Sequence, residues 1–492
     1  MIAMIIKGFV KLVLSVLLLL TTVIVGRTLM FTPQPLSDAA SQTASLPAIA
    51  TDQLAARLSA AIGFQTISFD DRSQIDYQEF SDFQHWLEQV YPVLHQQLEK
   101  IVINQHTLLF RWPAPSEQAG SILLSAHYDV VPVEPGTEAQ WQHPPFAGTI
   151  ADGYVWGRGA LDNKGAAIAM LEAVNLLLAS GYQPAKDIYL ALTHDEEIGS
   201  TEGAQGIVHY FRQHGIYPEW SLDEGSFVLQ GIIPGISEPV ASINIAEKGY
   251  LTLQLIAKGE GGHSSLPPPE TAVKILAAAL VKLHYAPLPG QLDGLSAAMY
   301  DSLARHMPLR YRVLFANRWL FGRLLESTLS ESAVGNAMLR TTTAPTMLSG
   351  SVKPNVLPIT ATATINFRIH PRDSVAEVVS WVRQAIDDER IQIRLVQQSE
   401  PSGVASQQSE AFRHLASSVQ QVHGPAIVIP GLTVAATDSR YYESGVKNAY
   451  RFNPMLLRQA DLAGFHGTNE RISIDNLEKA VQFYMLLLQA SN

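Results

Sequence analysis

The stretch DIYLALTHDEEIGS, residues 187–200, joins an apolar run to a histidine and three carboxylates. The run DIYLAL predicts a buried strand, because it is short and almost wholly apolar. Adjacent like charges repel one another and are usually spread out unless a strong positive charge lies among them. The stretch therefore predicts a strand whose end helps to hold metal ions, with Glu196 and Glu197 in different roles.

Strands and helices alternate along the chain on both sides of this stretch. SILLSA, residues 121–126, predicts a strand, and NKGAAIAMLEAVNLLLASG, residues 163–181, predicts a mostly apolar helix. A further helix is expected at residues 202–215. Such a β-α-β rhythm is typical of a mostly parallel sheet that helices cover on both faces, so the expected fold class is α/β.

The pattern changes near Glu247, where an inserted domain is expected. YLTLQLIAK, residues 250–258, alternates with period two. After it come a helix, two strands, a second helix and a last strand, expected at residues 270–284, 338–351, 361–370, 374–386 and 391–396. This β-α-β-β-α-β order is typical of a ferredoxin-like α+β domain. Its strand ATATINFRIH alternates apolar and polar residues, which predicts one buried face and one polar face free to cover the site.

These changes divide the chain into expected parts: an apolar segment at residues 1–31, a linker at 32–50, a catalytic domain at 51–246 and 401–492, and an inserted lid or dimerisation domain at 247–400. A helical insertion at about residues 293–330 interrupts the inserted domain. Within it, the apolar and aromatic segment 308–326 has two interpretations. It either packs as an ordinary core or lines a tunnel for a fatty acyl chain, in which each buried CH₂ is worth about 0.8 kcal/mol.

The N-terminal segment is apolar on every face. Lys7 and Lys11 precede an uncharged run from Leu12 to Gly26, and no small-residue cleavage site follows clearly. The segment predicts an uncleaved signal anchor that leaves the catalytic part outside the cytoplasm, with a cleaved signal peptide and a secreted or periplasmic protein as the alternative.

Composition narrows the chemistry of the site. The chain of 492 residues carries a net charge of −11, which argues against a nucleic-acid partner. It has no cysteine, which excludes disulfides, thiolate zinc sites and a cysteine nucleophile. Any metal must therefore be held by His, Asp and Glu. A serine hydrolase and a zincin are disfavoured because neither G-x-S-x-G nor H-E-x-x-H occurs in the chain.

Acids and histidines follow several of the predicted strands. HYD ends the first strand at His127, Asp162 lies in the turn before the apolar helix, and SLDEG places Asp223 at the end of another strand. The carboxyl ends of parallel strands meet at one crevice, where ligands bind. Asp162 alone would be read as a helix N-cap. Four acidic segments at one buried edge, however, would be costly without a cation.

The motifs HYDVVP, GRGALDNKG, HDEE, LDEG, GGHSS, KPNVLP, NFRIHP and FHGTNERIS occur in this order. In this respect the chain resembles the dinuclear zinc peptidases and amidohydrolases, which include aminoacylase, acetylornithine deacetylase, succinyl-diaminopimelate desuccinylase and carboxypeptidase S. The resemblance covers about residues 51–492 and is strongest for the branch of carboxypeptidase S and the N-fatty-acyl-amino acid synthase/hydrolases, whose pattern TDSRYYESGVKNAYRFNP matches.

This resemblance implies a zinc-peptidase-like fold that binds two Zn²⁺ ions, with Co²⁺ or Mn²⁺ as alternatives. His127 and Asp223 would hold one ion, Glu197 and His466 the other, and Asp162 would bridge both. It also implies that the peptide bond after Asp162 is cis.

The resemblance assigns further residues to catalysis. Asp129 would accept the hydrogen bond from the second imidazole nitrogen of His127, and Glu196 would be the general base acting on a hydroxide that bridges the ions. In the inserted domain, His263 would stabilise the oxyanion, while Asn355 and Arg368 would bind the substrate carboxylate.

The predicted function is that of a metal-dependent hydrolase that cleaves the amide bond of N-acyl amino acids or of short peptides with a free carboxylate. The expected partners are such small substrates, a membrane through the N-terminal segment, and a second copy through the inserted domain. The alternatives are a strict carboxypeptidase or dipeptidase and, outside the enzymes, a metal-free binding protein on the same fold.

Overall fold

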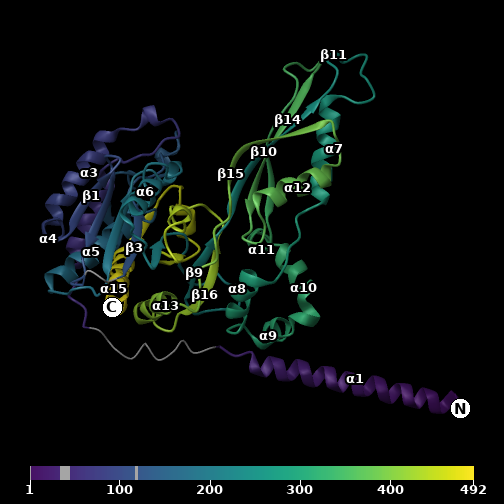
Figure 1. Ribbon diagram of the computed structural model, residues 1–492, viewed down its shortest axis with the longest axis horizontal. Coiled ribbons are helices and arrows are strands. Elements are labelled where there is room, and N and C mark those ends of the chain that lie inside the picture. Colours follow the sequence, from purple (N-terminus) through teal and green to yellow (C-terminus); the bar gives the residue numbers. More distant parts are fainter. Residues whose placement is uncertain (1, 34–44, 117–119, 492) are drawn as a thin grey trace. The chain divides into compact units, whose positions relative to one another are not determined.

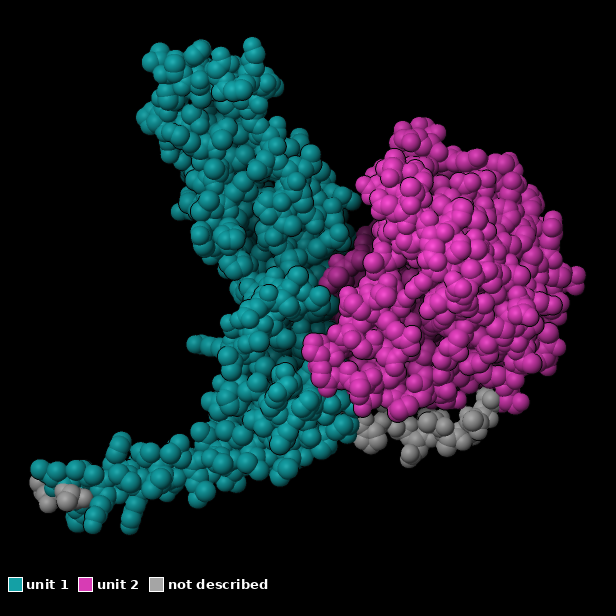
Figure 2. All heavy atoms as spheres, turned by 180° about the vertical axis from the view of Figure 1, so that it is seen from behind, with its two compact units in different colours: residues 1–34, 247–403 teal, residues 35–246, 404–492 magenta. Residues whose placement is uncertain are grey.

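The computed structural model describes residues 2–33, 45–116 and 120–491. The chain divides into two compact units: unit 1 comprises Met1–Gln34 and Glu247–Gly403, and unit 2 comprises Pro35–Ala246 and Val404–Asn492 (Figure 2). Residues 34–44 of the predicted linker lie outside the described residues.

Unit 2 is built on a large mixed sheet whose strand order is β1-β2-β6-β3-β7-β17-β9-β8-β18, with β16 paired to β9. Strands β1, β3, β9 and β16 of this sheet are labelled in Figure 1. Its central strands β6, β3, β7 and β17 run parallel to one another. The strand bounds are β1 Glu99–Ile103, β2 Thr107–Trp112, β3 Ser121–His127, β6 Asp187–Thr193, β7 Trp220–Asp223, β8 Val228–Leu229, β9 Val240–Glu247, β16 Ile427–Thr433, β17 Asn448–Arg451 and β18 Leu456–Leu457.

Helices cover both faces of this sheet, which confirms the predicted α/β class. On one face α5 packs against β3, α2, α4 and α15, and on the other α6 packs its Ile207 and Phe211 against Leu123 and Tyr189. The helix bounds are α2 Thr51–Gly63, α3 Tyr77–Val90, α4 Pro92–Gln97, α5 Lys164–Ala179, α6 Ala204–His214, α13 Glu410–His423, α14 Ser439–Tyr442 and α15 Ile474–Ala490.

A small antiparallel sheet in unit 2 joins two distant parts of the chain. It contains β4 Thr149–Ala151, β5 Tyr154–Trp156 and β19 Arg471–Ser473, in the order β19-β5-β4. The pairing of Arg471 with Trp156 brings the segment after His466 beside the loop that leads to Asp162.

Unit 1 contains a four-stranded antiparallel sheet in the order β12-β14-β10-β15. Its strands are β10 Gly249–Lys258, β12 Thr342–Ser349, β14 Thr360–Ile369 and β15 Ile391–Ser399, and its helices are α7 Ala272–Tyr285 and α12 Val375–Ile386. The chain follows the β-α-β-β-α-β order. In β14, Ala361, Ile365 and Phe367 are buried while Thr362 and Thr364 are partly exposed, as the alternation predicts. A separate two-stranded antiparallel sheet pairs β11 Gly262–His263 with β13 Val356–Leu357.

The helical insertion forms four helices in unit 1: α8 Gly294–Ala304, α9 Leu309–Ala316, α10 Arg318–Ser330 and α11 Ala333–Leu339. The N-terminal segment forms one helix, α1 Ile2–Met30. Residues Met4–Met30 are long and apolar enough to cross a membrane, with a mean hydropathy of 2.5 and none of the apolar window buried. The structure therefore does not place this helix in a protein core.

Candidate metal centre

Acidic and histidine side chains of unit 2 come together where its elements end. His127 is the last residue of β3, Glu196 and Glu197 begin the 3₁₀ turn after β6, and Glu224 follows β7. Asp162 precedes α5, and His466 follows a second short turn at residues 462–464. Because β3, β6 and β7 are parallel neighbours, their carboxyl ends bring these side chains to one place.

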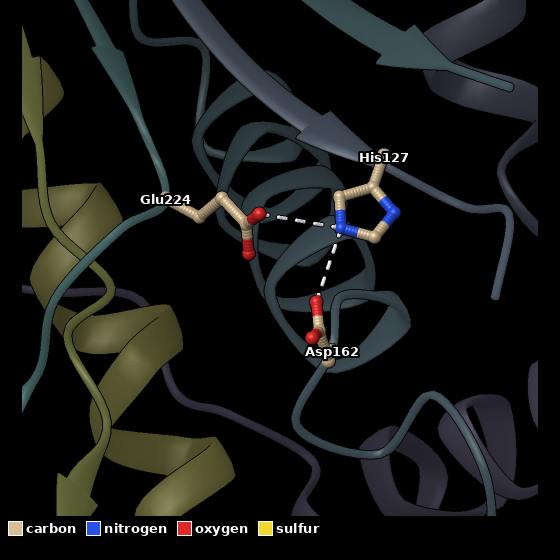
Figure 3. Close-up of side chains that lie close together, drawn as sticks. All are labelled: His127, Asp162 and Glu224. Carbon is tan, nitrogen blue, oxygen red and sulfur yellow. Dashed lines mark hydrogen bonds and ion pairs between the residues drawn. The ribbon is translucent and has the colours of Figure 1, made fainter. Parts of the chain in front are cut away.

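Asp162 lies between the two imidazoles. Its Oδ1 is 3.1 Å from Nε2 of His127, and its Oδ2 is 3.2 Å from Nε2 of His466. Glu197 Oε2 is 3.4 Å from His466 Nε2, and Glu224 Oε1 is 3.5 Å from His127 Nε2. Figure 3 shows His127 with its Nε2 directed at Asp162 and Glu224. Each imidazole thus faces one oxygen of Asp162 and one further carboxylate.

This set of donors fits metal ions. Ligand atoms around a tetrahedral zinc at 2.0–2.1 Å lie about 3.3 Å from one another, and the separations found here range from 3.1 to 3.5 Å. Three groups of described side chains meet the spacing of a metal site: His127 with Asp162 and Glu224, His127 with Glu196 and Glu197, and Asp162 with Glu197 and His466. Glu197 Oε1 is buried and has no hydrogen-bond partner among the described residues.

The electrostatics of the cluster also favour a cation. Burial and the charge of Asp162 raise the pKa of Glu197 to about 7. Burial and neighbouring carboxylates raise the pKa of Glu196 well above its usual value. Hydrogen bonds to Asp162 and Glu197 raise the pKa of His466 to about 10. Buried carboxylates that repel one another are costly unless positive charge compensates them.

The structure brings Glu224, and not Asp223, into the cluster. Asp223 is the last residue of β7 and Glu224 the first residue after it, and adjacent residues of an extended chain point to opposite sides. Asp223 is buried and belongs to none of the three groups with the spacing of a metal site, and burial followed by the charges of Asp438 and Glu224 raises its pKa well above the usual value. Asn163 donates a hydrogen bond to Glu224 and orients it. The geometry thus favours Glu224, the second acid of the motif LDEG, over the expected Asp223, and which of the two acids binds the ion stays a prediction.

Asp129 connects the predicted ligand to the predicted base. Nδ1 of His127 lies 3.0 Å from the main-chain oxygen of Asp129 and 3.3 Å from its carboxylate. The same carboxylate accepts hydrogen bonds from the backbone N–H groups of Glu196 at 3.3 Å and Glu197 at 3.2 Å, and from the Ser68 hydroxyl at 2.7 Å. Asp129 thus orients the imidazole and fixes the turn that carries both glutamates.

A second supporting carboxylate, Glu470, was not predicted. Its Oε1 accepts the N–H groups of Leu161 at 2.8 Å and Asp162 at 3.1 Å, and its Oε2 accepts Nη1 of Arg158 at 2.8 Å. Because Glu470 follows His466 in the motif FHGTNERIS, it holds the loops of Asp162 and His466 together. The peptide bond between Asp162 and Asn163 is cis, as the resemblance implied.

The predicted substrate-binding residues belong to unit 1. His263 lies exposed in the two-stranded sheet of β11 and β13, where its Nδ1 is 2.8 Å from the Ser265 hydroxyl. The main-chain oxygen of Asn355 accepts the N–H of Ser264 at 3.1 Å, so His263 and Asn355 are near neighbours. Arg368 lies on β14, with its guanidinium 4.8 Å from the centre of the Tyr250 ring. Their contacts with a substrate stay a prediction.

Known proteins resemble this chain over most of its length. Residues 123–490 match the family model described as Peptidase family M20/M25/M40. A probable carboxypeptidase S-like protein from Dictyostelium discoideum is 39% identical to this chain, in an alignment that covers 89% of this chain and 85% of that protein. An N-fatty-acyl-amino acid synthase/hydrolase from Xenopus tropicalis is 37% identical, covering 89% of this chain and 86% of its own length. The crystal structure of an M20 metallo-carboxypeptidase from Sulfolobus solfataricus shares the fold, with a TM-score of 0.63, 20% identity, and coverage of 89% of this chain and 99% of the other.

Proposed function

Because the chain belongs to peptidase family M20/M25/M40, as its motifs predicted, we propose that it hydrolyses the amide bond of N-acyl amino acids or of short peptides with a free carboxylate. Its relatives are named as carboxypeptidases and N-acyl amino acid hydrolases, and the chain is a metallohydrolase. The observation that supports the proposal is the carboxylate of Asp162 between the imidazoles of His127 and His466.

Two Zn²⁺ ions are the proposed cofactors, with Co²⁺ or Mn²⁺ as substitutes. His127 and Glu224 would hold one ion, Glu197 and His466 the other, and Asp162 would bridge them. Bound ions of this kind polarise an amide carbonyl and lower the pKa of water from about 15.7 toward about 7.

Glu196 is the proposed general base. It lies beside His127 and Glu197, and its backbone is held by Asp129. Its carboxylate would take a proton from the attacking water and deliver it to the leaving nitrogen. Asp129 keeps the His127 imidazole oriented throughout, because Nδ1 of His127 faces the main-chain and side-chain oxygens of Asp129.

Three residues of unit 1 are proposed to bind the substrate. His263 would donate a hydrogen bond to the oxyanion, and Asn355 with Arg368 would bind the free carboxylate, which a guanidinium suits because it presents two parallel N–H donors. This part of the proposal rests on the motifs GGHSS, KPNVLP and NFRIHP.

The acyl group is proposed to be a fatty acid, because several relatives are named N-fatty-acyl-amino acid synthase/hydrolase. A strict dipeptidase or carboxypeptidase is the second candidate, since carboxypeptidase S of Saccharomyces cerevisiae is 29% identical to the chain. The test is kcat/KM for N-acyl amino acids from acetyl to oleoyl, measured beside dipeptides with the same C-terminal residue. A rise with acyl length supports the proposal, whereas activity on dipeptides alone contradicts it.

Metal dependence is tested in the same preparation. Exhaustive chelation should abolish turnover of every substrate, and added Zn²⁺ should restore it. Full activity in a protein shown to be metal-free would contradict the proposal.

The N-terminal helix is proposed to anchor the enzyme in a membrane, with the catalytic part outside the cytoplasm, because α1 is apolar and largely exposed. The alternative, removal as a signal peptide, is tested by N-terminal sequencing of the protein isolated from membranes.

A homodimer through unit 1 is also proposed. Strand β12 lies at the edge of its sheet and exposes Met347 and Leu348, and Val273 of α7 is exposed close to Leu348. An exposed edge strand with apolar side chains is suited to pairing with a second copy. Leu348→Lys should then convert a dimer into a monomer in light scattering, while an unchanged mass would contradict this interface.

A further inference from the structure

The end of α1 is fastened to the helical insertion of unit 1. Nε of Arg27 donates to the main-chain oxygen of Ala316 at 2.9 Å, and Nη2 of Arg312 donates to that of Phe31 at 2.8 Å. The amide of Asn317 donates to the Thr28 hydroxyl at 3.2 Å. Figure 1 shows α1 leaving the insertion beside α9.

Apolar packing reinforces these hydrogen bonds. Phe31 is buried in a cluster with Phe315, Ala316 and Leu325 of α9 and α10 and with neighbours from the rest of the insertion. The guanidinium of Arg305 also lies 4.4 Å from the centre of the Phe31 ring. The apolar helix that could span a membrane therefore ends against α9 and the start of α10.

One side of α10, together with the start of α9, exposes apolar side chains at this place. Trp319, Leu320 and Leu324 of α10 are 55%, 44% and 55% exposed, and Leu309 of α9 is 62% exposed. At about 3.6 residues per turn, Leu320 and Leu324 are about 40° apart around the helix and Trp319 is about 100° from Leu320, so the three residues lie within an arc of about 140°. The segment 308–326 thus divides between a small core and an outward apolar surface, and its exposed members do not line an enclosed tunnel.

The same segment is basic in an acidic chain. Residues 308–326 contain the arginines 310, 312, 318 and 323 and one acid, Glu326, and Arg305 precedes them, although the whole chain has a net charge of −11. Arg305, Arg312 and Arg318 bond within unit 1, whereas Arg310 and Arg323 are exposed. Arg310 packs against the ring of Tyr311. Exposed arginines beside tryptophan and leucine suit the boundary between lipid headgroups and acyl chains.

We propose that α9 and α10 bind the surface of a lipid bilayer that contains anionic headgroups, at the point where α1 leaves that bilayer. Trp319, Leu320 and Leu324 enter the interface, and Arg310 and Arg323 contact the headgroups. The inference rests on the proposed membrane anchor. A lipid surface is favoured over a protein partner because these helices lie against the end of a membrane-length apolar helix and because their exposed charged residues, Arg310 and Arg323, are both basic.

The experiment uses the full chain in lipid nanodiscs. The natural sequence has no cysteine, so single-cysteine variants take one nitroxide label each. Leu320→Cys reports on the proposed surface, Leu18→Cys in α1 on the anchor, and Val334→Cys in α11, which is 69% exposed, serves as the control. Collision of the label with oxygen and with a water-soluble nickel complex measures its depth.

With phosphatidylglycerol in the discs, we expect the label at 320 to collide with nickel several-fold less than the label at 334. If the label at 18 is in lipid but the label at 320 is in water, α9 and α10 do not bind the lipid surface, and the proposed anchor is still supported. A label at 18 in water would overturn both.

Two further comparisons test the occupant. The double variant Arg310→Glu/Arg323→Glu should increase the collision of the label at 320 with the nickel complex. Arg413→Glu, on α13 of unit 2, is the control and should leave that collision rate unchanged. Equal collision rates in the double variant, the control and the protein without these substitutions would overturn the headgroup contact. Protection that requires two copies of the chain in one disc would assign this face to a dimer and overturn the lipid surface.

Discussion

Folded proteins usually expose charged side chains and bury apolar ones, and two regions of this molecule do the reverse. The metal centre of unit 2 buries charged groups, and α1 of unit 1 exposes apolar ones. The metal centre encloses the carboxylates of Asp162, Glu197 and Glu224, whereas α1 exposes leucines, valines and isoleucines on all its faces. Buried charge and exposed apolar surface both cost free energy in water. Each region would therefore be stabilised by a partner from outside the chain, and the proposed partners are cations for unit 2 and lipid for α1.

Helix α5 shows that an apolar sequence alone does not distinguish these cases. Like α1, it is apolar around most of its circumference, yet Ile168, Met170 and Leu171 are buried beneath α2, α4, α15 and β3. In α1, the described contacts with the rest of unit 1 involve its last turns. What separates the two helices is the presence of other parts of the chain on their apolar faces.

The largest expected effect is on kcat, in a variant of the metal centre that should lose catalysis but keep its metal. Glu196→Gln should lower kcat by about 10²- to 10⁴-fold, because it removes the proposed proton acceptor. Metal content, measured on the purified protein, should stay at the unsubstituted level because Glu196 is not among the proposed ligands. Glu410→Gln, which changes an exposed carboxylate of α13, is the control. Unchanged turnover in Glu196→Gln would refute the assignment of the base.

A charge placed in α1 tests the other side of the comparison. Leu18→Asp should weaken membrane insertion by about 3 kcal/mol, because an aspartate in the middle of a span costs that much. The variant should move from the alkali-resistant membrane fraction to the soluble fraction. The same aspartate at Leu266, an exposed residue after β11, should leave the fractionation unchanged. Equal retention of both variants in the membrane would contradict the anchor.

Asp223 and Glu224, two adjacent acids at the end of β7, allow a test of which carboxylate binds the proposed ion. Glu224→Gln should weaken metal affinity by at least about 10- to 100-fold, since even residues that only support ligands contribute that much. Asp223→Asn should retain the metal, because Asp223 belongs to none of the side-chain groups that have the spacing of a metal site. Metal affinity can be measured by competition with a chelator. The reverse result would restore Asp223 as the ligand.

The contrast between these two acids shows how far the sequence could predict the site. His127, Asp162, Glu197 and His466 are each the histidine or acid that their family motif singles out, and the structure brings all of them together. The motif LDEG contains two acids, and the choice between them depends on which side of β7 its last residue faces. That is decided by where the strand ends, which a short motif does not specify.

Long-range contacts were the part that the sequence could not predict. Glu470 supports Asp162 across more than 300 positions of the chain, and Arg27 contacts Ala316 across 289. Strand and helix patterns depend on neighbours along the sequence and were predicted well, as in β14 and α12. The docking of α1 on the insertion has no local pattern, so only the three-dimensional structure reveals it.

The smallest expected effect concerns a buried titratable side chain that needs no outside partner. His370, at the end of β14, is 3% exposed, and burial together with the charges of Arg372 and Lys248 lowers its pKa to about 3. Its Nδ1 accepts the N–H of Arg372 at 3.2 Å, and its Nε2 lies 3.2 Å from the Ser296 hydroxyl. The neutral imidazole is therefore satisfied inside unit 1, in contrast to the carboxylates of the metal centre, for which the proposed compensation is bound ions.

The low pKa of His370 predicts a loss of stability in mild acid. Between about pH 6.5 and about pH 3 the unfolded chain binds a proton at His370 and the folded chain does not, so stability falls as the pH is lowered through this range. From pH 7 to pH 5 the loss attributable to His370 should be about 2 kcal/mol. Amide hydrogen exchange of β14, corrected for the intrinsic rates at each pH, measures this loss, and His370→Gln should reduce it by that amount. If the exchange of β14 depends equally on pH in both proteins, His370 is not the neutral buried group that its contacts indicate.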